Sequence, residues 1–575
     1  MRSRFLLYVL PILVMISTFG IYFIEGYGDS PYTNLFDSLW WTIVTFTTVG
    51  YGDLSPATIE GKLFGMLILV FGVIINSIII SIIANWFFTF QSSKAQGRKA
   101  VKMKDHVLIC SDDPAFVTSL VYESKEYVED HKLIIIWPFD RHPLVGTPLE
   151  KIRWISGLAS HKEVLKKASG ENSKIAYVSY KDDSFTVMAV MQLENMTAGV
   201  VLTMARYSSH QDYRIHLDNV GCDYAVRPFD IYAPLMVQAF YSQGAPEWIR
   251  EVIMSNENSP TLKNRTLQER YANRQWLSYI REMKRTSSEM PLGIIENEGQ
   301  IIINPPYDYL LSTKSRILSL TPAASRNRGD QLSDAMPISG IASINTKGHI
   351  LICSDQRPFI NRLLNEIKKA HIKDEIVVIA NMPISRLYHE MPNVKWLETS
   401  SFSEEGFTQA GAQHAKVALV DHKQDSHTLM AVLRLEIITK GAVFSVASYR
   451  ESGFDAQLIQ AGCDVCLNVD ELVAPILSQT ANHFGLGFLV EEMISRDDHS
   501  QSLFVRTLND SWKTCKWDVV IEGFIKEYGF LPVGFIKRKE EKMVVNPDMN
   551  CEVEVGDTII FITRADTKIE ASCFA

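Results

Sequence analysis

Thr47-Thr-Val-Gly-Tyr-Gly-Asp53 is the stretch that decides how the N-terminal part of this chain folds. Its two glycines, two positions apart, break regular helix and strand. It stands between two long uncharged apolar runs, Phe5 to Ile24 and Leu63 to Phe90, and includes the end of a shorter apolar segment at 34–47. Irregular backbone at membrane depth is tolerated only inside protein or along a water-filled path. The stretch therefore predicts a loop that lies within a membrane pore.

The two apolar runs predict membrane-spanning helices. The first has 20 residues and as a helix reaches ~30 Å, the thickness of the hydrocarbon layer. A secretory signal peptide is the alternative, because Arg2 and Arg4 precede this run, but the run lacks a small-residue cleavage site. The second run has 28 residues, enough to cross with a tilt. The 14-residue segment at 34–47 is too short to cross and predicts a re-entrant helix.

Basic residues predict the orientation of these helices. Arg2 and Arg4 precede the first run, and five Lys or Arg residues lie between 94 and 104, after the second. The segment 25–62 between the runs has five acidic residues and one Lys. By the positive-inside rule, both termini are cytoplasmic and 25–62 faces outward. We therefore expect a multi-pass protein of the cell inner (plasma) membrane.

Length and composition exclude several classes of protein. The chain has 575 residues, a formal charge of -9 and eight Cys without the spacing of a disulfide framework. The length suggests several domains. The acidic balance argues against a nucleic-acid partner, and the sparse Cys argue against a small secreted scaffold.

Residues Thr47–Asp53 closely resemble the selectivity filter of potassium channels, in which carbonyl oxygens replace the hydration shell of the ion. The resemblance implies that Trp40 and Trp41 form an aromatic cuff around the filter. One chain supplies one strand of a ring, so we expect a homotetramer in the lipid bilayer. The resemblance implies a filter made of Thr48, Val49, Gly50, Tyr51, Gly52 and Asp53, with K+ held by Thr48, Val49, Gly50 and Tyr51.

The second apolar run contains the residues expected at the gate. In the potassium-channel family a glycine of the inner helix serves as a gating hinge, and Gly72 matches it by position. Close helix packing is an equally good interpretation of Gly72. Asn76, Ser77 and Ser81 are polar within an Ile-rich stretch, and a polar residue facing lipid would be costly. We expect these three on the pore wall.

The rest of the chain is a duplication with a period of about 242 residues. His106-Val-Leu-Ile-Cys-Ser-Asp112 recurs as His349-Ile-Leu-Ile-Cys-Ser-Asp355, and Gly221-Cys-Asp223 recurs as Gly462-Cys-Asp464. In each copy, short apolar runs alternate with helical stretches, which predicts a doubly wound parallel sheet with helices on both faces. A more β-rich part follows and predicts a small appended lobe.

A two-span pore followed by tandem Rossmann-like units resembles the channels gated by RCK (regulator of K+ conductance) domains. The predicted fold class is an all-α, two-span pore domain with a re-entrant pore helix, followed by two α/β Rossmann-like RCK domains, each with a small β-rich appended lobe. The expected boundaries are a pore domain at 1–91, a linker at 92–104, a first RCK domain at 105–320 (core 105–240, lobe 260–320), a linker at 321–347 and a second RCK domain at 348–575 (core 348–482, lobe 500–575).

The ligand of these domains stays open at this stage. A dinucleotide site normally has G-x-G-x-x-G after its first strand, but Cys110–Ala115 and Cys353–Pro358 lack those glycines. Asp112 or Asp113 is expected to cap the following helix. NAD or an adenine nucleotide remains an option, because Trp137 could stack on a base and Arg141 or Arg357 could bind phosphate.

A divalent cation such as Ca2+ is the other option. In the calcium-gated members of the family, a carboxylate follows strand four, and Asp183 and Asp425 match it. Their other two carboxylates are absent here, so the same Ca2+ site is not expected, although Asp182, Asp183 and Asp223 could form a different one. The full set of candidate ligand-binding residues is Asp113, Trp137, Asp140, Arg141, Asp183, Arg357, Asn381 and Asp425.

The sequence thus predicts a potassium-selective tetrameric channel, gated by an intracellular ligand that binds a ring of eight RCK domains coupled to the inner helices. The alternative is a regulatory or pore subunit of a potassium transport system, which normally has several filter-like repeats where this chain has one. An oxidoreductase is disfavoured by the missing glycines, and no enzyme activity is expected.

Overall fold

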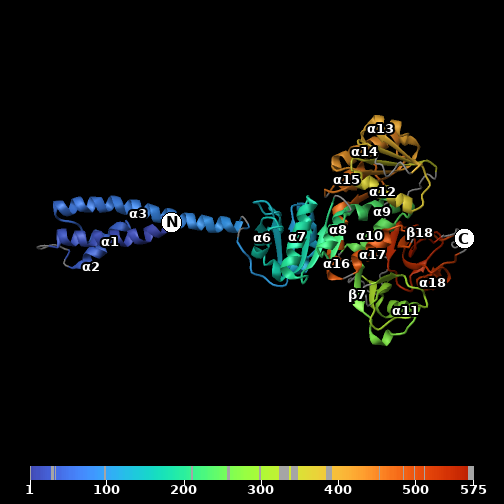
Figure 1. Ribbon diagram of the computed structural model, residues 1–575, viewed down its shortest axis with the longest axis horizontal. Helices are drawn as coiled ribbons and strands as arrows, with labels where there is room; N and C mark the ends of the chain where they lie inside the picture. The colour runs from blue at the N-terminus through green and yellow to red at the C-terminus, as the bar shows by residue number, and fades with distance from the viewer. Residues whose placement is uncertain are drawn as a thin grey trace. The chain divides into compact units, whose positions relative to one another are not determined.

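The computed structural model divides the chain into two compact units, residues 1–99 and 100–575, each of which is described by itself (Figure 1). Much of the linker expected at 321–347, the side chain of Asn76 and parts of the connection at 92–104 lie outside the described residues. The described residues are 2–26, 32, 34–95, 97, 99–208, 212–254, 260–296, 300–322, 336–337, 347–383, 391–451, 453–483, 485–497, 499–509 and 512–567.

The first unit consists of three helices, α1 (Arg2–Glu25), α2 (Leu35–Phe46) and α3 (Ile59–Ala95). The side chain of Asn34 caps α2 by accepting a hydrogen bond from the N–H of Asp37 at 2.9 Å. The helices share a small apolar core that includes Ile21, Trp41 and Ile68. Its position at the junction of the three helices fixes the start of the loop after α2.

Over the part of the chain that the structure describes, none of the helices combines the length and the apolar character required to cross a membrane.

The second unit begins with a six-stranded parallel sheet of order β3-β2-β1-β4-β5-β6. Its central strands are buried on both faces, as parallel strands covered by helices on each side must be. The order reverses between β1 and β4, where the carboxyl ends form a crevice. The strands are β1 (His106–Ser111), β2 (Leu133–Trp137), β3 (Arg153–Ser156), β4 (Ser173–Ser179), β5 (Leu202–Arg206) and β6 (Tyr224–Val226), and the helices are α4 (Pro114–Glu123), α5 (Lys125–Glu129), α6 (Lys162–Lys167), α7 (Asp183–Thr197), α8 (Asp212–Asn219), α9 (Pro228–Tyr241) and α10 (Ala245–Ile253).

A second parallel sheet repeats this topology with the order β14-β13-β12-β15-β16-β17. The duplication in the sequence therefore produces two sheets with the same switch point, here between β12 and β15. The strands are β12 (His349–Ser354), β13 (Ile376–Ala380), β14 (Val394–Glu398), β15 (Ala415–Asp421), β16 (Phe444–Tyr449) and β17 (Val465–Asn468), and the helices are α12 (Arg357–Lys369), α13 (Glu404–Gln409), α14 (Asp425–Thr439), α15 (Phe454–Gln460), α16 (Val469–Asn482) and α17 (Leu486–Ile494).

Antiparallel sheets follow each parallel sheet. The first has the order β7-β10-β8-β9 and is accompanied by α11 (Trp276–Ser287); the second has the order β11-β21-β20-β23-β18 and is accompanied by α18 (Trp517–Gly523). The strands are β7 (Thr261–Thr266), β8 (Met290–Ile295), β9 (Ile301–Ile303), β10 (Arg316–Thr321), β11 (Met336–Pro337), β18 (Gln501–Thr507), β20 (Leu531–Lys537), β21 (Lys542–Val545) and β23 (Thr558–Arg564), with the small pair β19 (Cys515–Lys516) and β22 (Glu552–Val553).

The two halves of this unit pack reciprocally. Helix α10 begins after Gly244, where an added Cβ would lie 2.4 Å from Ile536 of the second antiparallel sheet. Helix α17 begins after Gly485, where a Cβ would lie 2.9 Å from Ile295 of the first. Both glycines have φ near +95° (96° and 94°), which disfavours other residues. Each helix therefore lies against the sheet of the opposite half.

Two glutamines reinforce this exchange. Gln238 of α9 donates from Nε2 to the carbonyl of Ile494 at the end of α17, at 3.1 Å. Gln479 of α16 donates in the same way to the carbonyl of Ile253 at the end of α10. The last carbonyls of a helix have no partner within the helix, so each half satisfies a helix end of the other. One apolar core contains residues of both halves.

Candidate functional site

The loop after α2 has an alternating backbone. Thr48, Gly50 and Gly52 have φ of 59°, 56° and 76°, whereas Val49 and Tyr51 between them are not in the positive-φ region. In a strand successive carbonyls point to opposite sides, but an alternation in the sign of φ turns successive peptide groups the same way. A positive φ at a β-branched residue such as Thr48 is uncommon and is tolerated mainly at functional sites.

The body of α2 fixes this loop at its start and at its end. The N–H of Val49 donates to the carbonyl of Val44 at 3.0 Å, which ties the loop to the last turn of the helix. The indole Nε1 of Trp40 donates to Oδ2 of Asp53 at 2.8 Å. The Trp40 ring also stacks on Tyr51, with centroids 5.8 Å apart and planes 2° from parallel. Trp40 thus links α2 to Tyr51 and Asp53 of the loop. An aromatic cuff was expected in this region.

Glu25 makes a connection that the sequence did not indicate. Its Oε1 accepts hydrogen bonds from the N–H and the hydroxyl of Thr58, at 2.9 and 2.6 Å, and the side chain is buried. Thr58 in turn accepts from the N–H of Gly61 at the start of α3. The carboxylate therefore joins the end of α1 to the positive end of the α3 dipole. The only sequence signal was an acidic residue directly after an apolar run.

The expected gate residues lie along α3. An added Cβ at Gly72 would be 2.8 Å from Cδ1 of Phe46, so this glycine permits close packing of α2 on α3. The Ser77 hydroxyl donates to the carbonyl of Val73 in its own helix at 2.8 Å, and Ser77 and Ser81 are exposed in the single chain. The close contact at Gly72 accounts for the glycine without a hinge; a hinge role stays a prediction.

An ion pair closes the crevice of the first parallel sheet. Asp113 caps α4 by accepting from the N–H of Ala115, and its other oxygen lies 2.6 Å from Nη2 of Arg206 at the end of β5. The Arg206 guanidinium also lies over the ring of Phe116. In Rossmann folds a ligand phosphate sits at this helix N-terminus. In this protein the Asp113 carboxylate occupies that position and pairs with the Arg206 guanidinium.

The crevice of the second sheet is closed by a different pair. Asp421, at the end of β15, is fully buried and lies 3.0 Å from Nη2 of Arg450. It also accepts hydrogen bonds from Gln356, at 2.6 Å, and from Ser448. Tyr232 of α9, in the first half, donates its hydroxyl to the same carboxylate at 3.3 Å. This closure therefore includes a residue from each half of the unit.

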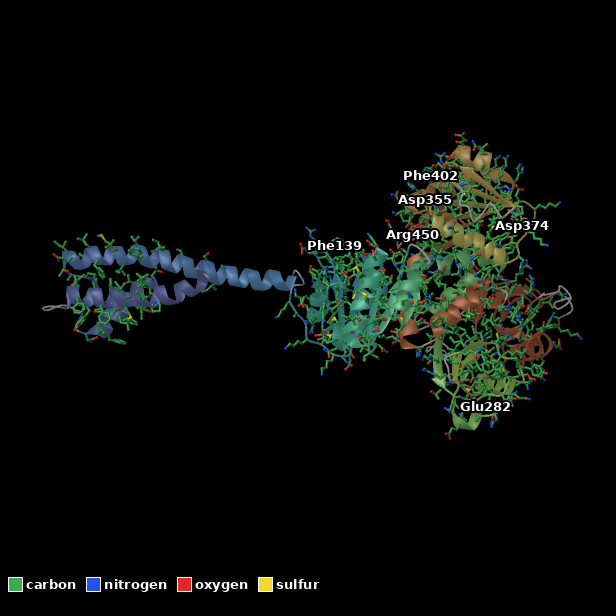
Figure 2. All side chains as sticks on the ribbon, viewed as in Figure 1. Phe139, Glu282, Asp355, Asp374, Phe402 and Arg450 are labelled. Atoms are coloured by element: carbon green, nitrogen blue, oxygen red, sulfur yellow. The ribbon has the colours of Figure 1, made fainter. Side chains whose placement is uncertain are left out.

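Two histidines lie beside Arg450 in the second crevice. Arg450 donates from Nη1 to the carbonyl of His422 at 2.7 Å, and the His422 Nε2 lies 2.7 Å from the Ser401 hydroxyl. Phe402 stacks on His427, with centroids 4.6 Å apart, and Asp355 lies 3.9 Å from His427. Figure 2 labels Phe402, Asp355 and Arg450 in this part of the molecule. Burial lowers the pKa of His422 to about 4, so this buried ring stays neutral near pH 7.

The acidic residues expected to bind a divalent cation are already hydrogen-bonded to backbone. Both oxygens of Asp183 accept from the N–H of Ser208, at 2.9 and 3.1 Å. Asp425 accepts from the N–H groups of Arg450 and Glu451, at 2.9 and 2.7 Å. Among the residues that the structure describes, no group of three or more His, Cys, Asp or Glu side chains is arranged to hold a metal ion.

The remaining ligand candidates do not converge. Trp137 is only 4% exposed and packs in the apolar core, so its ring could stack on a base only after a rearrangement. Asp140, Arg141 and Asn381 are exposed. Arg357 donates from Nη2 to the carbonyl of Pro383 at 2.9 Å. Sequence reasoning did not identify Arg206, Asp421 or Arg450, because their pairing depends on strand ends that are far apart in the chain.

Comparison with known proteins places these features in context. Residues 9–89 match the family model described as ion channel. The putative potassium channel protein YugO of Bacillus subtilis is 26% identical over 194 residues, which cover 32% of this chain and 57% of that protein. The voltage-gated potassium channel of Aeropyrum pernix is 42% identical over 76 residues, which cover 13% of this chain and 25% of that protein.

A solved structure supports the fold of the remainder. The human SLO3 gating ring matches with a TM-score of 0.61 and 12% identity, over 81% of this chain and 100% of that chain. At this identity the similarity concerns the fold alone. The chain spans 57% and 25% of the length of the two curated relatives above. These relatives are channels rather than enzymes, which agrees with the expectation that the chain has no enzyme activity.

Proposed function

We propose, from the premise that this chain belongs to the potassium channels that carry RCK domains, that four copies surround one axis and conduct K+ selectively. The observation that carries the proposal is the alternating backbone of residues 48–52. It turns successive carbonyls toward one side, as a filter that replaces the hydration shell of K+ requires. In this proposal Thr48, Val49, Gly50 and Tyr51 supply the oxygen ligands.

The exposure of the loop supports the proposed homotetramer. Val49 and Tyr51 are 53% and 68% exposed in the single chain, and one strand of carbonyls cannot surround a cation. Three further copies would cover these side chains and complete the ring. Asn76, Ser77 and Ser81 would then line the pore below the filter.

The proposed topology rests on the apolar runs of the sequence rather than on the described helices: the runs at 5–24 and 63–90 cross the inner membrane, the segment at 34–47 is re-entrant and both termini are cytoplasmic. Apolar side chains on α1 and α3, such as Ile12, Met15, Leu67 and Val70, are more than half exposed, at 55–59%. Such side chains suit contact with lipid or with neighbouring copies. The basic residues that follow α3 agree with a cytoplasmic end.

Gating would come from the repeated half-units, of which four chains supply eight. A ligand shifts an equilibrium only by its differential affinity for the two states. A shift from 1:99 to 99:1 needs about 5.5 kcal/mol, or about 0.7 kcal/mol for each of eight sites. A nucleotide at the first crevice would compete with Asp113 for Arg206. A small difference in the affinity of the ligand for the open and closed states would be sufficient to open or close the pore, if the connection at 92–104 transmits it.

Potassium flux into liposomes that contain the purified full-length protein tests this function. We expect K+ flux to exceed Na+ flux by at least about tenfold, and we expect Gly50→Ala to abolish the flux, because φ of 56° disfavours a residue with a Cβ. The matched control is Gly146→Ala, since Gly146 also has a positive φ and open space around it but lies in the second unit. Equal K+ and Na+ fluxes, or full activity of Gly50→Ala, would refute the proposal.

A further inference from the structure

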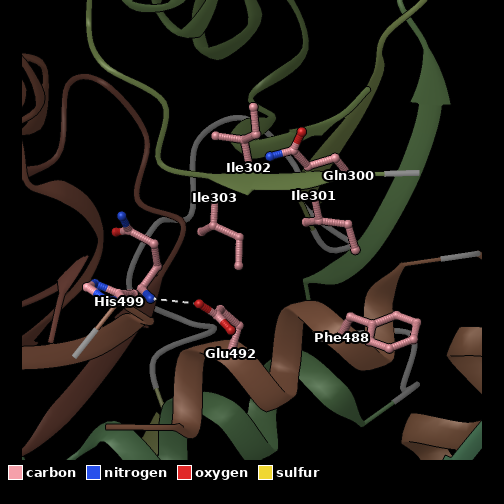
Figure 3. A pocket seen from close by; sticks show the side chains of 8 residues that line it. Gln300, Ile301, Ile302, Ile303, Phe488, Glu492 and His499 are labelled. Carbon is pink, nitrogen blue, oxygen red and sulfur yellow. Dashed lines mark hydrogen bonds between the residues drawn. The ribbon is translucent and has the colours of Figure 1, made fainter. Parts of the chain in front are cut away.

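A pocket of about 550 Å³ lies between the two halves of the second unit, away from both crevices (Figure 3). Its walls come from β9 in the first half and from α17 and the start of β18 in the second. The volume falls in the range of small-molecule sites. A ligand here would contact both halves at once.

One side of the pocket is apolar. Ile301 and Ile303 point from β9 toward α17, where Phe488 lies (Figure 3). The two isoleucines share one face because alternate residues of a strand point the same way. These three side chains offer a surface for the apolar body of a ligand.

The other side contains the polar residues Glu492, His499 and Gln501. The Glu492 carboxylate accepts the N–H of Gln501 at 3.1 Å, and its pKa is raised by burial and by the neighbouring Asp497, another acid. Within the described residues, no donor reaches the buried Oε1 of Gln501. None of the described residues that line the pocket is Lys or Arg.

The corresponding place in the other half is covered. There β11, from the segment that joins the halves, pairs with β21, so that Met336 lies opposite Met543. Among the described strands, β9 has β8 as its neighbour on one side and stands at the edge of its sheet. Among the described strands, β9 therefore stands at an open edge, whereas its counterpart β21 is paired with β11 on that side.

We propose that this pocket binds a small organic cation, an ammonium compound with a compact apolar body. The ammonium group donates to the Glu492 carboxylate, and the body contacts Ile301, Ile303 and Phe488. The Glu492 carboxylate lines the pocket and no described lining residue is Lys or Arg, so this site favours a cation over a phosphate-bearing ligand. The site is thus distinct from the crevices in which a nucleotide was considered.

Binding of 2-phenylethylammonium to the purified full-length protein tests the inference, measured by isothermal titration calorimetry beside the anion 3-phenylpropionate, which has a similar body. We expect saturable binding of the cation and at least about tenfold weaker binding of the anion. Glu492→Gln keeps the shape and an acceptor for Gln501 but removes the charge. It should weaken binding of the cation by about tenfold or more, since hydrogen bonds to charged groups are the stronger ones.

The matched control is Glu251→Gln. Glu251 is the seventh residue after Gly244, as Glu492 is the seventh after Gly485. It lies on α10, which packs against the sheet whose strand β21 is paired with β11. This variant should bind the cation as the wild type does. Equal binding of the two probes, absence of cation binding, or undiminished binding by Glu492→Gln would each overturn the inference. Because binding is measured without flux, its outcome is independent of whether the pore conducts K+.

Discussion

In the first half of the second unit, the ion pair between Asp113, after β1, and Arg206, at the end of β5, closes the crevice. In the second half, the equivalent positions hold uncharged residues. The residues that correspond to this pair in the repeat are Gln356 and Ser448. The acid of the second half is instead Asp421, at the end of β15, and its cation is Arg450. The two crevices thus lie in equivalent sheets and are each closed by an Asp–Arg ion pair. The two ion pairs occupy different positions of the repeat.

The two crevices are therefore not equivalent. The first closure lies within one sheet and its side chains keep 14% and 17% exposure. The second includes the Tyr232 hydroxyl from the opposite half, and its Asp421 carboxylate is 0% exposed. A ligand in the first crevice would meet a partly solvated pair. One in the second would have to disturb a contact between the halves.

The largest expected effect is a difference in stability between variants of Asp421 and Asp113. Asp421→Asn leaves the Arg450 guanidinium without its closest counter-charge in a buried site, which should cost about 3–5 kcal/mol of unfolding free energy. The same change at the first crevice, Asp113→Asn, should cost only about 1–2 kcal/mol, because that pair is partly solvated and Asn is also a good helix cap. Urea unfolding of the full-length protein, followed by circular dichroism, compares them. A larger loss for Asp113→Asn would show that the ranking is wrong.

Acid should destabilise the second half through His422. The pKa of this buried histidine is lowered from 6.5 to about 4, so the unfolded chain takes up a proton before the folded one does. The stabilisation from the neutral ring is complete above pH 6.5 and is lost as the pH falls through about 4, a loss of about 3 kcal/mol.

The first half supplies the control for this pH dependence. The residues that correspond to Ser401 and His422 there are Ala159 and Tyr180, and the Tyr180 hydroxyl accepts the N–H of Ala159 at 3.0 Å. The double variant Ser401→Ala/His422→Tyr should therefore lose less stability than the wild type between pH 6.5 and pH 4, as measured by unfolding at each pH. Parallel pH profiles for the two proteins would exclude His422 as the titrating group.

The smallest expected effect concerns the contact across the halves. Tyr232→Phe removes one hydroxyl that donates to Asp421, which should cost about 1 kcal/mol of unfolding free energy. Tyr122→Phe, at a side chain that is 57% exposed, should leave the stability unchanged within error. Equal effects of the two variants would mean that the hydroxyl at 232 does not stabilise the contact.

Sequence patterns predicted the architecture better than the side-chain pairing. The runs at 107–110 and 350–353 are apolar at every position, which predicts strands buried on both faces, and the structure has them in parallel sheets. A cap by Asp112 or Asp113 was also predicted, because its signal is local, and the structure has it at Asp113. The pair of Asp113 with Arg206 spans 93 residues and that of Tyr232 with Asp421 spans 189, so neither has a signature in a single sequence.

The residue roles at the loop and in the crevices depend on assembly and ligand, which one chain does not contain. The filter assignment of residues 48–53 and the ligand-binding candidates therefore remain predictions. Trp137 illustrates the limit of the sequence. An aromatic residue at the end of a strand suggested stacking on a base, but the same residue type also fills an apolar core, where the structure places it.

The exchange of α10 and α17 has a consequence for the origin of the molecule. Gly244 and Gly485 bring each helix against the sheet of the other half, and Gln238 and Gln479 donate to the last carbonyls of α17 and α10, respectively. An ancestor with a single copy could have satisfied the same surfaces only by pairing with an identical chain about a two-fold axis. Gene fusion would then have turned that homodimer into one polypeptide and freed the two crevices to diverge.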